Sequence, residues 1–491
     1  MNPGEITRRA AVGGLAAAGL GFALFGPRGS RESAGRIDGR VVLDYWEKWT
    51  RHEGDAMREV VRRFNESQDR LHVRYVVTAD IGQKSMVAIA GGAPPDLIGL
   101  YAFNVPGYAE SGALHPLDEL APKFGVTLDQ YAEGVRGVMT HEPPGVGVGV
   151  GVGVGTEVPT RRVGVHGDDS TRAVGVPGAP PRWFACVNTA GSVALYYSKA
   201  AFRDAGLDPE RGPRTIAELD EFHARLIRRG RGGGGGGEGG ALERVGFFHP
   251  EPGWWSWIWA YHFGGSIYDR RRDAALADSR ENVAALEWMQ RYSHELGVKE
   301  CQAFKESFGN YFTPENPFLT GKVAMIVQGP WVANLMPAFA PGFEYGVCPM
   351  PGLEAGGPPI GHIDTDVIVI PRGARHPEAS MEFIAWTQRQ DMTELLATAH
   401  CKPSPLARAS DEFLANHPNR GVQVHYDIFR SPRAFLAPRT RVWQQYKDEF
   451  DTHVQRLWRH EASPGEAMAR MQARAQGFIT RAADQRERRA D

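Results

Sequence analysis

AIAGGAPPDLIGLYAFNVPGYAESGALHPL, residues 88–117, is the stretch that decides the fold. An apolar helical face closes at Ile89, and the Gly and Pro pairs within 91–95 stop the helix. A short apolar strand, 97–100, follows and opens into an exposed loop. Ligands of open α/β sheets bind outside the carboxyl ends of the strands, so this loop predicts three ligand-binding residues: Tyr101, Phe103 and Asn104.

The preceding segment predicts the first strand and helix of the same sheet. Residues 41–45 form a β-rich run, residues 53–64 carry apolar side chains on one helical face, and residues 71–77 form the next strand. This βαβ opening predicts a mostly parallel sheet covered by helices. The first strand ends in three further predicted ligand-binding residues: Trp46, Glu47 and Trp49.

Four motifs, in order, resemble the family 1 extracellular solute-binding proteins of ABC sugar importers, the maltose-binding-protein-like group. The first consists of Gly91, Gly92, Pro95, Asp96, Ala109, Gly112 and Leu114. The second is the strand at 194–199. The third is Thr215-x-x-Glu218-Leu219, which also reads as a capping box and therefore predicts a helix starting there. The fourth is the run from Phe318 to Trp331.

The resemblance implies an α/β protein with the two-lobed periplasmic-binding-protein fold, type II-like, in which each lobe is discontinuous and the ligand cleft lies between the lobes. We expect the first lobe to comprise residues 40–190 and 345–390, and the second to comprise 192–343 and 391–482. Gly-rich sequence interrupts both lobes, at 141–181 and at 230–240. These tracts supply few side chains for a core, so we expect a disordered insertion and a flexible surface loop.

A second group of candidate site residues comes from the later part of the chain. Residues 251–261 hold four tryptophans within six positions; about half of these rings suit a buried helix face, and Trp254 and Trp255 are the ones we assign to ligand. Trp331 matches a ligand-stacking position of the family, with packing over a helix start as the alternative. His362 and Asp364 fall where the family has a cleft edge, although a lone His is more often a satisfied loop residue.

Composition excludes several classes of function. The chain has 491 residues, enough for two cores, and a net charge of −2, which argues against binding to nucleic acid. Four dispersed cysteines without a CxxC pair argue against a metal site, leaving free thiols or one disulfide as the alternatives. We expect no cofactor and no enzyme activity, since no catalytic signature occurs; a glycosidase pair of Glu47 and Asp364 is the alternative considered.

The N-terminal region, 1–36, reads as a twin-arginine-type export signal and linker, with Arg8-Arg9 ahead of a weakly apolar run. It predicts a periplasmic or extracellular protein, either released or tethered through an uncleaved signal. The expected function is to bind a mono- or oligosaccharide as a monomer and deliver it to ABC transporter permease subunits. The alternatives are a binding protein for a phosphorylated polyol such as glycerol 3-phosphate, an extracellular carbohydrate-active enzyme, and a scaffold with a degenerate cleft.

Overall fold

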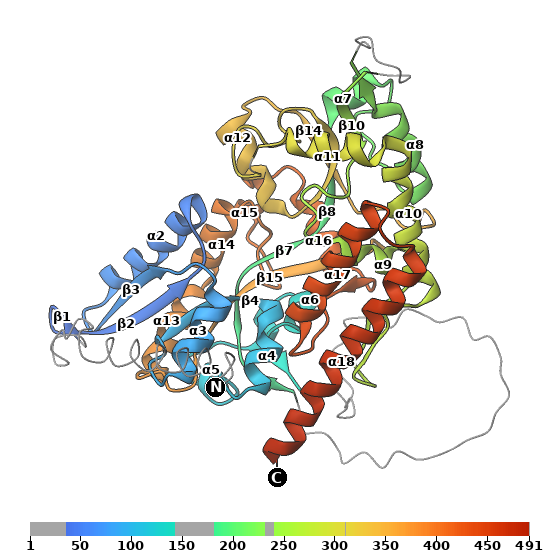
Figure 1. Cartoon of the computed structure of the whole chain (residues 1–491). Coiled ribbons are helices and arrows are strands. Elements are labelled where there is room, and N and C mark those ends of the chain that lie inside the picture. The colour runs from blue at the N-terminus through green and yellow to red at the C-terminus, as the bar shows by residue number, and fades with distance from the viewer. Residues whose placement is uncertain (1–35, 143–180, 231–239, 310, 491) are drawn as a thin grey trace, which may run out of the picture.

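The computed structural model describes residues 36–142, 181–230, 240–309 and 311–490. The predicted export signal lies outside these residues apart from its last position, as do nearly all of the two Gly-rich tracts. The described chain forms two lobes, each built on its own sheet with helices on its faces (Figure 1). In this part of the chain, no helix is long and apolar enough to cross a membrane.

The first sheet has seven strands in the order β1-β2-β4-β15-β16, with β3 on β2 and β7 on β15. β3 and β4 each pair with β2 in parallel orientation. β15 pairs with β4 and with β7, and it is antiparallel to both. The predicted βαβ opening is therefore confirmed. The expectation of a mostly parallel sheet was wrong, because β15 enters between β4 and β7 antiparallel to both, and the sheet has three parallel and three antiparallel strand pairs. The strands are β1 (Arg36–Ile37), β2 (Arg40–Glu47), β3 (Leu71–Val77), β4 (Leu97–Tyr101), β7 (Cys186–Ser192), β15 (Gly361–Val369) and β16 (Ala434–Phe435).

The second sheet has five strands in the order β14-β8-β13-β10-β9. These are β8 (Ala194–Ser198), β9 (Arg228–Arg229), β10 (Leu242–Phe247), β13 (Val323–Gln328) and β14 (Tyr345–Cys348). Two small pairs complete the strands: β5 (Thr140–His141) with β6 (Arg182–Trp183), and β11 (Tyr268–Asp269) with β12 (Ala274–Ala275).

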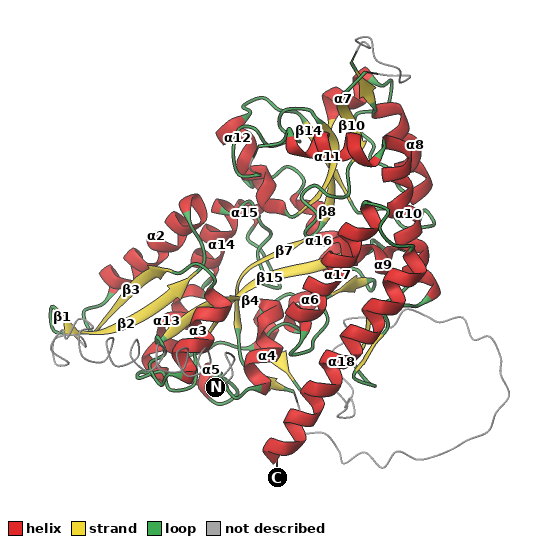
Figure 2. Ribbon diagram, viewed as in Figure 1, coloured by secondary structure: helices red, strands yellow, loops and turns green. Residues whose placement is uncertain are grey.

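Helices cover both sheets (Figure 2). Those of the first lobe are α2 (Arg51–Ser67), α3 (Ile81–Ala90), η1 (Ala102–Asn104), α4 (Val105–Glu110), α5 (Leu120–Lys123), η2 (Leu128–Gln130), α6 (Glu133–Arg136), α13 (Pro377–Thr387), α14 (Gln390–Ala399), α15 (Asp411–Ala415) and α16 (Val422–Phe429). Those of the second lobe are α7 (Lys199–Asp204), α8 (Ile216–Leu226), η3 (Ser256–Ile258), α9 (Trp259–His262), α10 (Arg280–Leu296), α11 (Val298–Glu306), η4 (Pro330–Asn334), α12 (Leu335–Phe339), α17 (Trp443–Trp458) and α18 (Pro464–Ala490).

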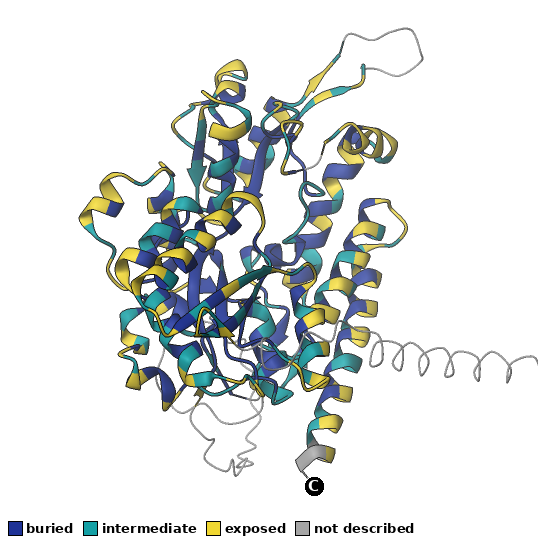
Figure 3. Cartoon of the chain, turned by 90° about the vertical axis from the view of Figure 1, so that its left-hand side faces the viewer, coloured by how far each residue is buried: buried dark blue, intermediate teal, exposed yellow. Residues whose placement is uncertain are grey.

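Each lobe has its own hydrophobic core, and the buried residues concentrate on the sheets while exposed residues lie on the outer faces of the helices (Figure 3). Helix α8 shows how local sequence sets these elements. The hydroxyl of Thr215 accepts a hydrogen bond of 3.1 Å from the Glu218 N–H, which caps the helix as its sequence predicts. Its buried side chains, which include Leu219, Phe222 and Leu226, then join the second core.

The chain passes between the lobes three times, and two of these passages differ from the expected boundaries. The first separates β7 from β8 at Val193. The second lies after β14, because Tyr345 and its strand pair with β8 in the second sheet; placing the start of the first lobe's second segment at 345 was wrong. The third lies near 435–442 and not near 390.

Packing explains the late third passage. Helix α14 lies against α2 and β7, and its side chains Met392, Leu396 and Ala397 are buried in the first core. Helix α16 contributes Tyr426 and Phe429 to the same core. The segment from 391 to about 434 therefore belongs to the first lobe, although its sequence shows only apolar helical stripes that either lobe could bury.

Candidate functional site

Three strands bring polar side chains to one edge of the first sheet. β2 and β4 are parallel, so their carboxyl ends, at Glu47 and Tyr101, face the same way. β15 runs antiparallel beside β4 and places Asp366 opposite Tyr101. This edge faces the second lobe (Figure 1), at the position where open α/β sheets bind ligands.

Four buried charged residues, Glu47, Lys48, Asp366 and Lys402, form what we call the charged floor. The Lys48 ammonium lies 3.1 Å from Glu47 Oε1 and 2.9 Å from Asp366 Oδ1. Lys402 Nζ lies 2.8 Å from Asp366 Oδ2, and the Thr189 hydroxyl donates to the same oxygen at 2.8 Å. No side chain of the four is more than 10% exposed, so the ion pairs are screened little by water.

The lysines determine how the floor titrates. Burial alone would raise the pKa of Asp366, but the adjacent charges of Lys402 and Lys48 hold it well below its ordinary value. Burial likewise acts to lower the pKa of Lys48, and Asp366 and Glu47 more than reverse that effect. Two cations therefore face two carboxylates, and the floor carries no net charge.

Asp364 lies two residues before Asp366 on β15, so both side chains are on the same face of the strand. Burial, together with the negative charge of Asp366, raises the pKa of Asp364 to about 7. Among the described residues, no side chain hydrogen-bonds to its carboxyl group. Near neutral pH this group can therefore donate or accept a hydrogen bond from a ligand hydroxyl.

Aromatic rings of the first lobe stand beside the floor. The rings of Tyr101 and Phe103 stack with centroids 5.3 Å apart, and Tyr101 is 42% exposed. The Lys48 ammonium lies 4.6 Å from the centroid of Tyr101 and 5.0 Å from that of Trp49. Trp49 itself is buried against the His400 ring. Tyr101 is therefore the exposed aromatic surface on this side.

The second lobe presents a facing aromatic group. Trp331, in η4, lies 5.8 Å from Trp255 between ring centroids, and Trp255 lies 5.5 Å from Trp254. The Lys402 ammonium lies 5.4 Å from the centroid of Trp331. A cation of the first lobe thus contacts a ring of the second, and all three tryptophans remain partly exposed.

Several predicted site residues lie elsewhere. Trp46 packs against the first core. Asn104 lies beside α3, where its amide would be 3.7 Å from a β-carbon at Gly82. His362 is 4% exposed and packs between Trp257 and Phe435, with ring centroids at 4.9 and 5.7 Å. The expected cleft-edge histidine is therefore part of the packing between lobes, and burial lowers its pKa to about 4.

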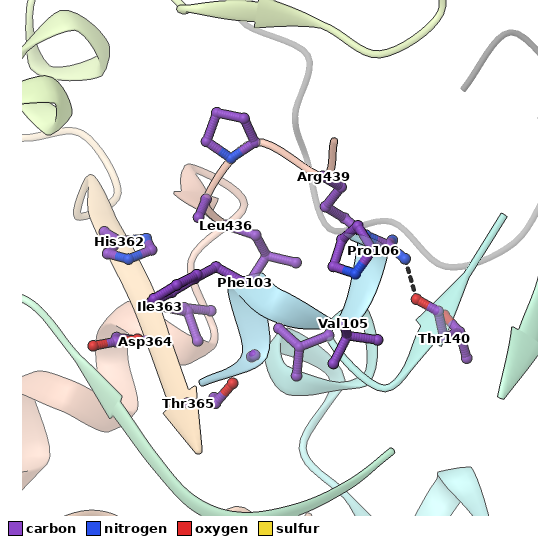
Figure 4. A pocket seen from close by; sticks show the side chains of 14 residues that line it. Phe103, Val105, Pro106, Thr140, His362, Ile363, Asp364, Thr365, Leu436 and Arg439 are labelled. Atoms are coloured by element: carbon purple, nitrogen blue, oxygen red, sulfur yellow. Dashed lines mark hydrogen bonds between the residues drawn. The ribbon is translucent and has the colours of Figure 1, made fainter. Parts of the chain in front are cut away.

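A pocket adjoins this packing (Figure 4). Phe103 and Ile363 line it from the first lobe, and Leu436 closes it from the passage between lobes. Arg439 donates a hydrogen bond to the carbonyl of Thr140 at its far end. The pocket wall is mostly apolar, so Phe103 serves as an interlobe packing residue as well as the partner of Tyr101.

Three residues of the charged floor, Lys48, Asp366 and Lys402, are not among the predicted ligand-binding residues, although Asp366 lies two positions after the predicted Asp364. Lys48 stands between predicted positions, and the strand-end rule that selected Glu47 and Trp49 applies to it equally. Lys402 comes from the loop after α14 and meets Asp366 only through the tertiary fold. No local sequence pattern marks it.

Glu47 is engaged by groups of its own lobe. Glu47 accepts hydrogen bonds from the Tyr45 hydroxyl at 2.6 Å and from the Lys48 N–H at 2.8 Å, and it is fully buried. Its carboxylate lies directly over Gly99, where a β-carbon would overlap it. Within the described ranges no cluster of three potential metal ligands occurs, and the four cysteines are free.

Comparisons with known proteins agree with this geometry. Residues 167–392 match the family model described as bacterial extracellular solute-binding protein. The structure titled "CpMnBP1 with Mannotriose Bound" has a TM-score of 0.71 at 24% identity, covering 89% of this chain and 100% of that one. The GacH receptor of Streptomyces glaucescens has a TM-score of 0.65 at 16% identity, covering 91% of this chain and 99% of that one. UgpB from Mycobacterium tuberculosis, in complex with glycerophosphocholine, has a TM-score of 0.66 at 20% identity, covering 91% of this chain and 100% of that one.

These structures share the fold over about nine-tenths of the chain, which confirms the expected two-lobed α/β architecture with discontinuous lobes. The family that matches residues 167–392 is one of extracellular solute-binding proteins. Over residues 167–392 the chain is therefore similar to the bacterial extracellular solute-binding proteins, and its fold is that of the two-lobed binding proteins named above.

Proposed function

We propose that the protein binds a neutral mono- or oligosaccharide between its lobes and delivers it to the permease subunits of an ABC importer. The observation that carries this proposal is the charged floor, in which polar groups are concentrated but already neutralised in pairs. Aromatic rings stand on both sides of it. Sugar rings offer apolar faces and a rim of hydroxyls, which match such a combination.

Charge favours a sugar over a phosphorylated polyol. A phosphate group would have to draw Lys48 or Lys402 away from Asp366, and so leave that buried carboxylate with one lysine instead of two. A hydroxyl group adds a hydrogen bond without displacing either ion pair. The glycerol 3-phosphate alternative therefore requires a rearrangement that a neutral ligand does not.

In this proposal Tyr101, Asp364 and the floor hold the sugar from the first lobe, and Trp331 with Trp255 stack on it from the second. A ligand that contacts both lobes favours the arrangement in which they are close. Export by the twin-arginine route, release or tethering, and a monomeric state are further parts of the proposal. Export rests on residues 1–36 and the monomeric state on the family resemblance.

The test is calorimetric titration with mannotriose, maltotriose, glucose, glycerol 3-phosphate and glycerophosphocholine. We expect binding to at least one neutral sugar and a loss of about thirtyfold, ~2 kcal/mol, in Trp331→Ala. Trp386→Ala is the matched control, since Trp386 is a partly buried indole on α13 that packs against Phe64 in the first lobe. It should lower stability and leave affinity unchanged.

Other results would point to other functions. Binding confined to the phosphorylated compounds would replace the sugar by a phosphorylated polyol. Release of reducing ends from the oligosaccharides, lost in both Glu47→Gln and Asp364→Asn, would indicate an enzyme. Unchanged scattering dimensions and no heat with a wider sugar panel would favour a scaffold.

A further inference from the structure

The last helix, α18, is anchored in the second lobe but extends beyond it. Five of its buried side chains join the second core and form one stripe: Met468, Met471, Ala475, Ile479 and Ala482. Gln472 and Gln476 also hydrogen-bond to the backbone of the second lobe at Ala275 and Ala277. After Ala482 the helix continues alongside α4 of the first lobe (Figure 1).

Arg486 lies four residues after Ala482 and therefore on the same face of the helix. Its guanidinium contacts both lobes. Nη1 lies 2.9 Å from Oε2 of Glu110, in α4 of the first lobe, and Nη2 lies 2.5 Å from Oδ2 of Asp273, in the turn between β11 and β12 of the second. The arginine is one-quarter exposed, and Glu110 is 1% exposed.

Glu110 depends on these partners. Burial acts to raise its pKa, but hydrogen bonds from His141 and Arg486 hold the pKa below its ordinary value. Its second oxygen lies 3.2 Å from Nε2 of His141, also in the first lobe. A carboxylate buried to this degree is unfavourable without a cation beside it, and the cation that satisfies Oε2 comes from the other lobe.

Neighbouring contacts follow the same seam. Arg270 of the second lobe lies 2.7 Å from Glu142 of the first. Helix α4 approaches the backbone before α17 so closely that a β-carbon at Gly107 would lie 3.4 Å from the carbonyl oxygen of Arg441. Any rotation of one lobe against the other must part or slide these surfaces.

We propose that Glu110, Arg486 and Asp273 form an ionic clasp that restrains the two lobes relative to each other in the absence of ligand. The C-terminal helix acts as its arm, because its packing fixes Arg486 in the second lobe while the guanidinium engages the first. The clasp does not depend on what the cleft binds, so a test can disprove it without affecting the proposed function.

Interlobe distances in the ligand-free protein test the clasp. Spin labels at Glu66→Cys and Glu221→Cys report on α2 of the first lobe and α8 of the second, and both positions are more than half exposed. Adding Arg486→Met should broaden the distance distribution and introduce a population that the parent lacks. Asp273→Asn, which leaves the bond from Arg486 to Glu110, should have a smaller effect.

Two further variants make the result decisive. Arg488→Met removes an exposed arginine from the same helix and should leave the distribution unchanged. Glu110→Gln should broaden it as Arg486→Met does, and the double variant should add nothing beyond either single change. If Arg486→Met and Glu110→Gln both give the parent distribution, with near-ultraviolet circular dichroism showing folded protein, the lobes are held by packing alone and the clasp is disproved.

Discussion

Trp331 of the second lobe packs against Gly191 of strand β7, with its ring 3.5 Å from the point where a β-carbon on Gly191 would stand. Pro330 is closer still, at 3.2 Å from the same point. Gly191 comes two residues before Val193, where the chain first passes between the lobes. The proposed ligand-stacking ring is therefore in contact with the strand about which the lobes would turn.

This contact predicts that Gly191→Ala weakens ligand binding about tenfold, ~1.4 kcal/mol, because the added methyl group overpacks the joint and displaces Trp331. Titration with whichever sugar binds the parent measures the loss. Gly465→Ala is the control, since its β-carbon would meet no atom within 4 Å. Equal affinities for Gly191→Ala and the parent would show that the joint adapts without moving the ring.

Removing one partner of the charged floor should be costly. Lys402→Met leaves Asp366 buried beside one lysine instead of two, and we expect roughly 3 kcal/mol of lost stability, at the lower end of the range for broken buried pairs. Urea unfolding measures it. The control is Arg62→Met, whose ion pairs with Glu59 and Glu66 are on the surface, where water screens them, and should contribute little to stability. A similarly small loss of stability in Lys402→Met and Arg62→Met would mean that water reaches the charged floor.

Asp364 predicts a pH dependence of opposite sign to that of Asp366. Its pKa is about 7 in the folded protein, against 3.8 for an ordinary Asp, so the folded state holds the proton more tightly. Stability contributed by this group is therefore present below about pH 4 and is lost as pH rises toward 7. In Asp364→Asn this decline should vanish, so thermal melting of variant and parent should diverge steadily from pH 4 to 7. Parallel curves would place the carboxyl group in water.

His249 predicts instability toward acid. It lies among the rings of Phe247, Trp288 and Tyr292, burial holds its pKa well below 6.5, and neither ring nitrogen has a hydrogen-bond partner among the described residues. In the unfolded chain His249 binds a proton near pH 6.5, whereas in the folded protein it stays neutral at that pH. Stability therefore falls as pH drops below 6.5. His249→Phe should flatten the slope of unfolding free energy between pH 6.5 and 4.5. An unchanged slope would assign it to other buried histidines, such as His223, whose pKa is about 4.

The arginine pair near the N-terminus predicts the route of export. Replacing Arg8 and Arg9 together with lysine should keep the protein in the cytoplasm, because a twin-arginine signal is read through both guanidinium groups. Immunoblots of cytoplasmic and exported fractions measure the distribution. Export of the double variant at the parent level would rule out this route.

Local patterns predicted the elements of the fold but not where they would be packed. The capping hydroxyl of Thr215 and the helical stripe of 53–64 each determine their own structure, because the interactions involved lie within a few residues. Residues 345–348, by contrast, were assigned to the wrong lobe. Their partner strand, β8, lies about 150 residues earlier in the chain, and nothing in these residues distinguishes the two sheets.

In the candidate site, too, some residues could be predicted from local sequence and others are placed only by tertiary packing. Glu47 and Tyr101 followed from the rule that ligands meet strand ends, and the structure places both at the expected edge. Lys402 could not be predicted, since only the packing of α14 against α2 brings its loop to Asp366. His362 was misplaced because the sequence does not show that Trp257 and Phe435 would enclose its ring.

The interleaved strands also bear on the order in which the lobes can form during synthesis. Every strand of the second sheet has been synthesised once Cys348 is added, whereas the first sheet lacks β15 until Val369. β4, β7 and β16 all pair with β15, so the earlier strands of the first lobe wait with unpaired edges while the chain runs through the whole second sheet. A chain that has left the ribosome as far as Cys348 would display all strands of the second sheet beside an open first sheet, and those edges are where a chaperone would be needed first.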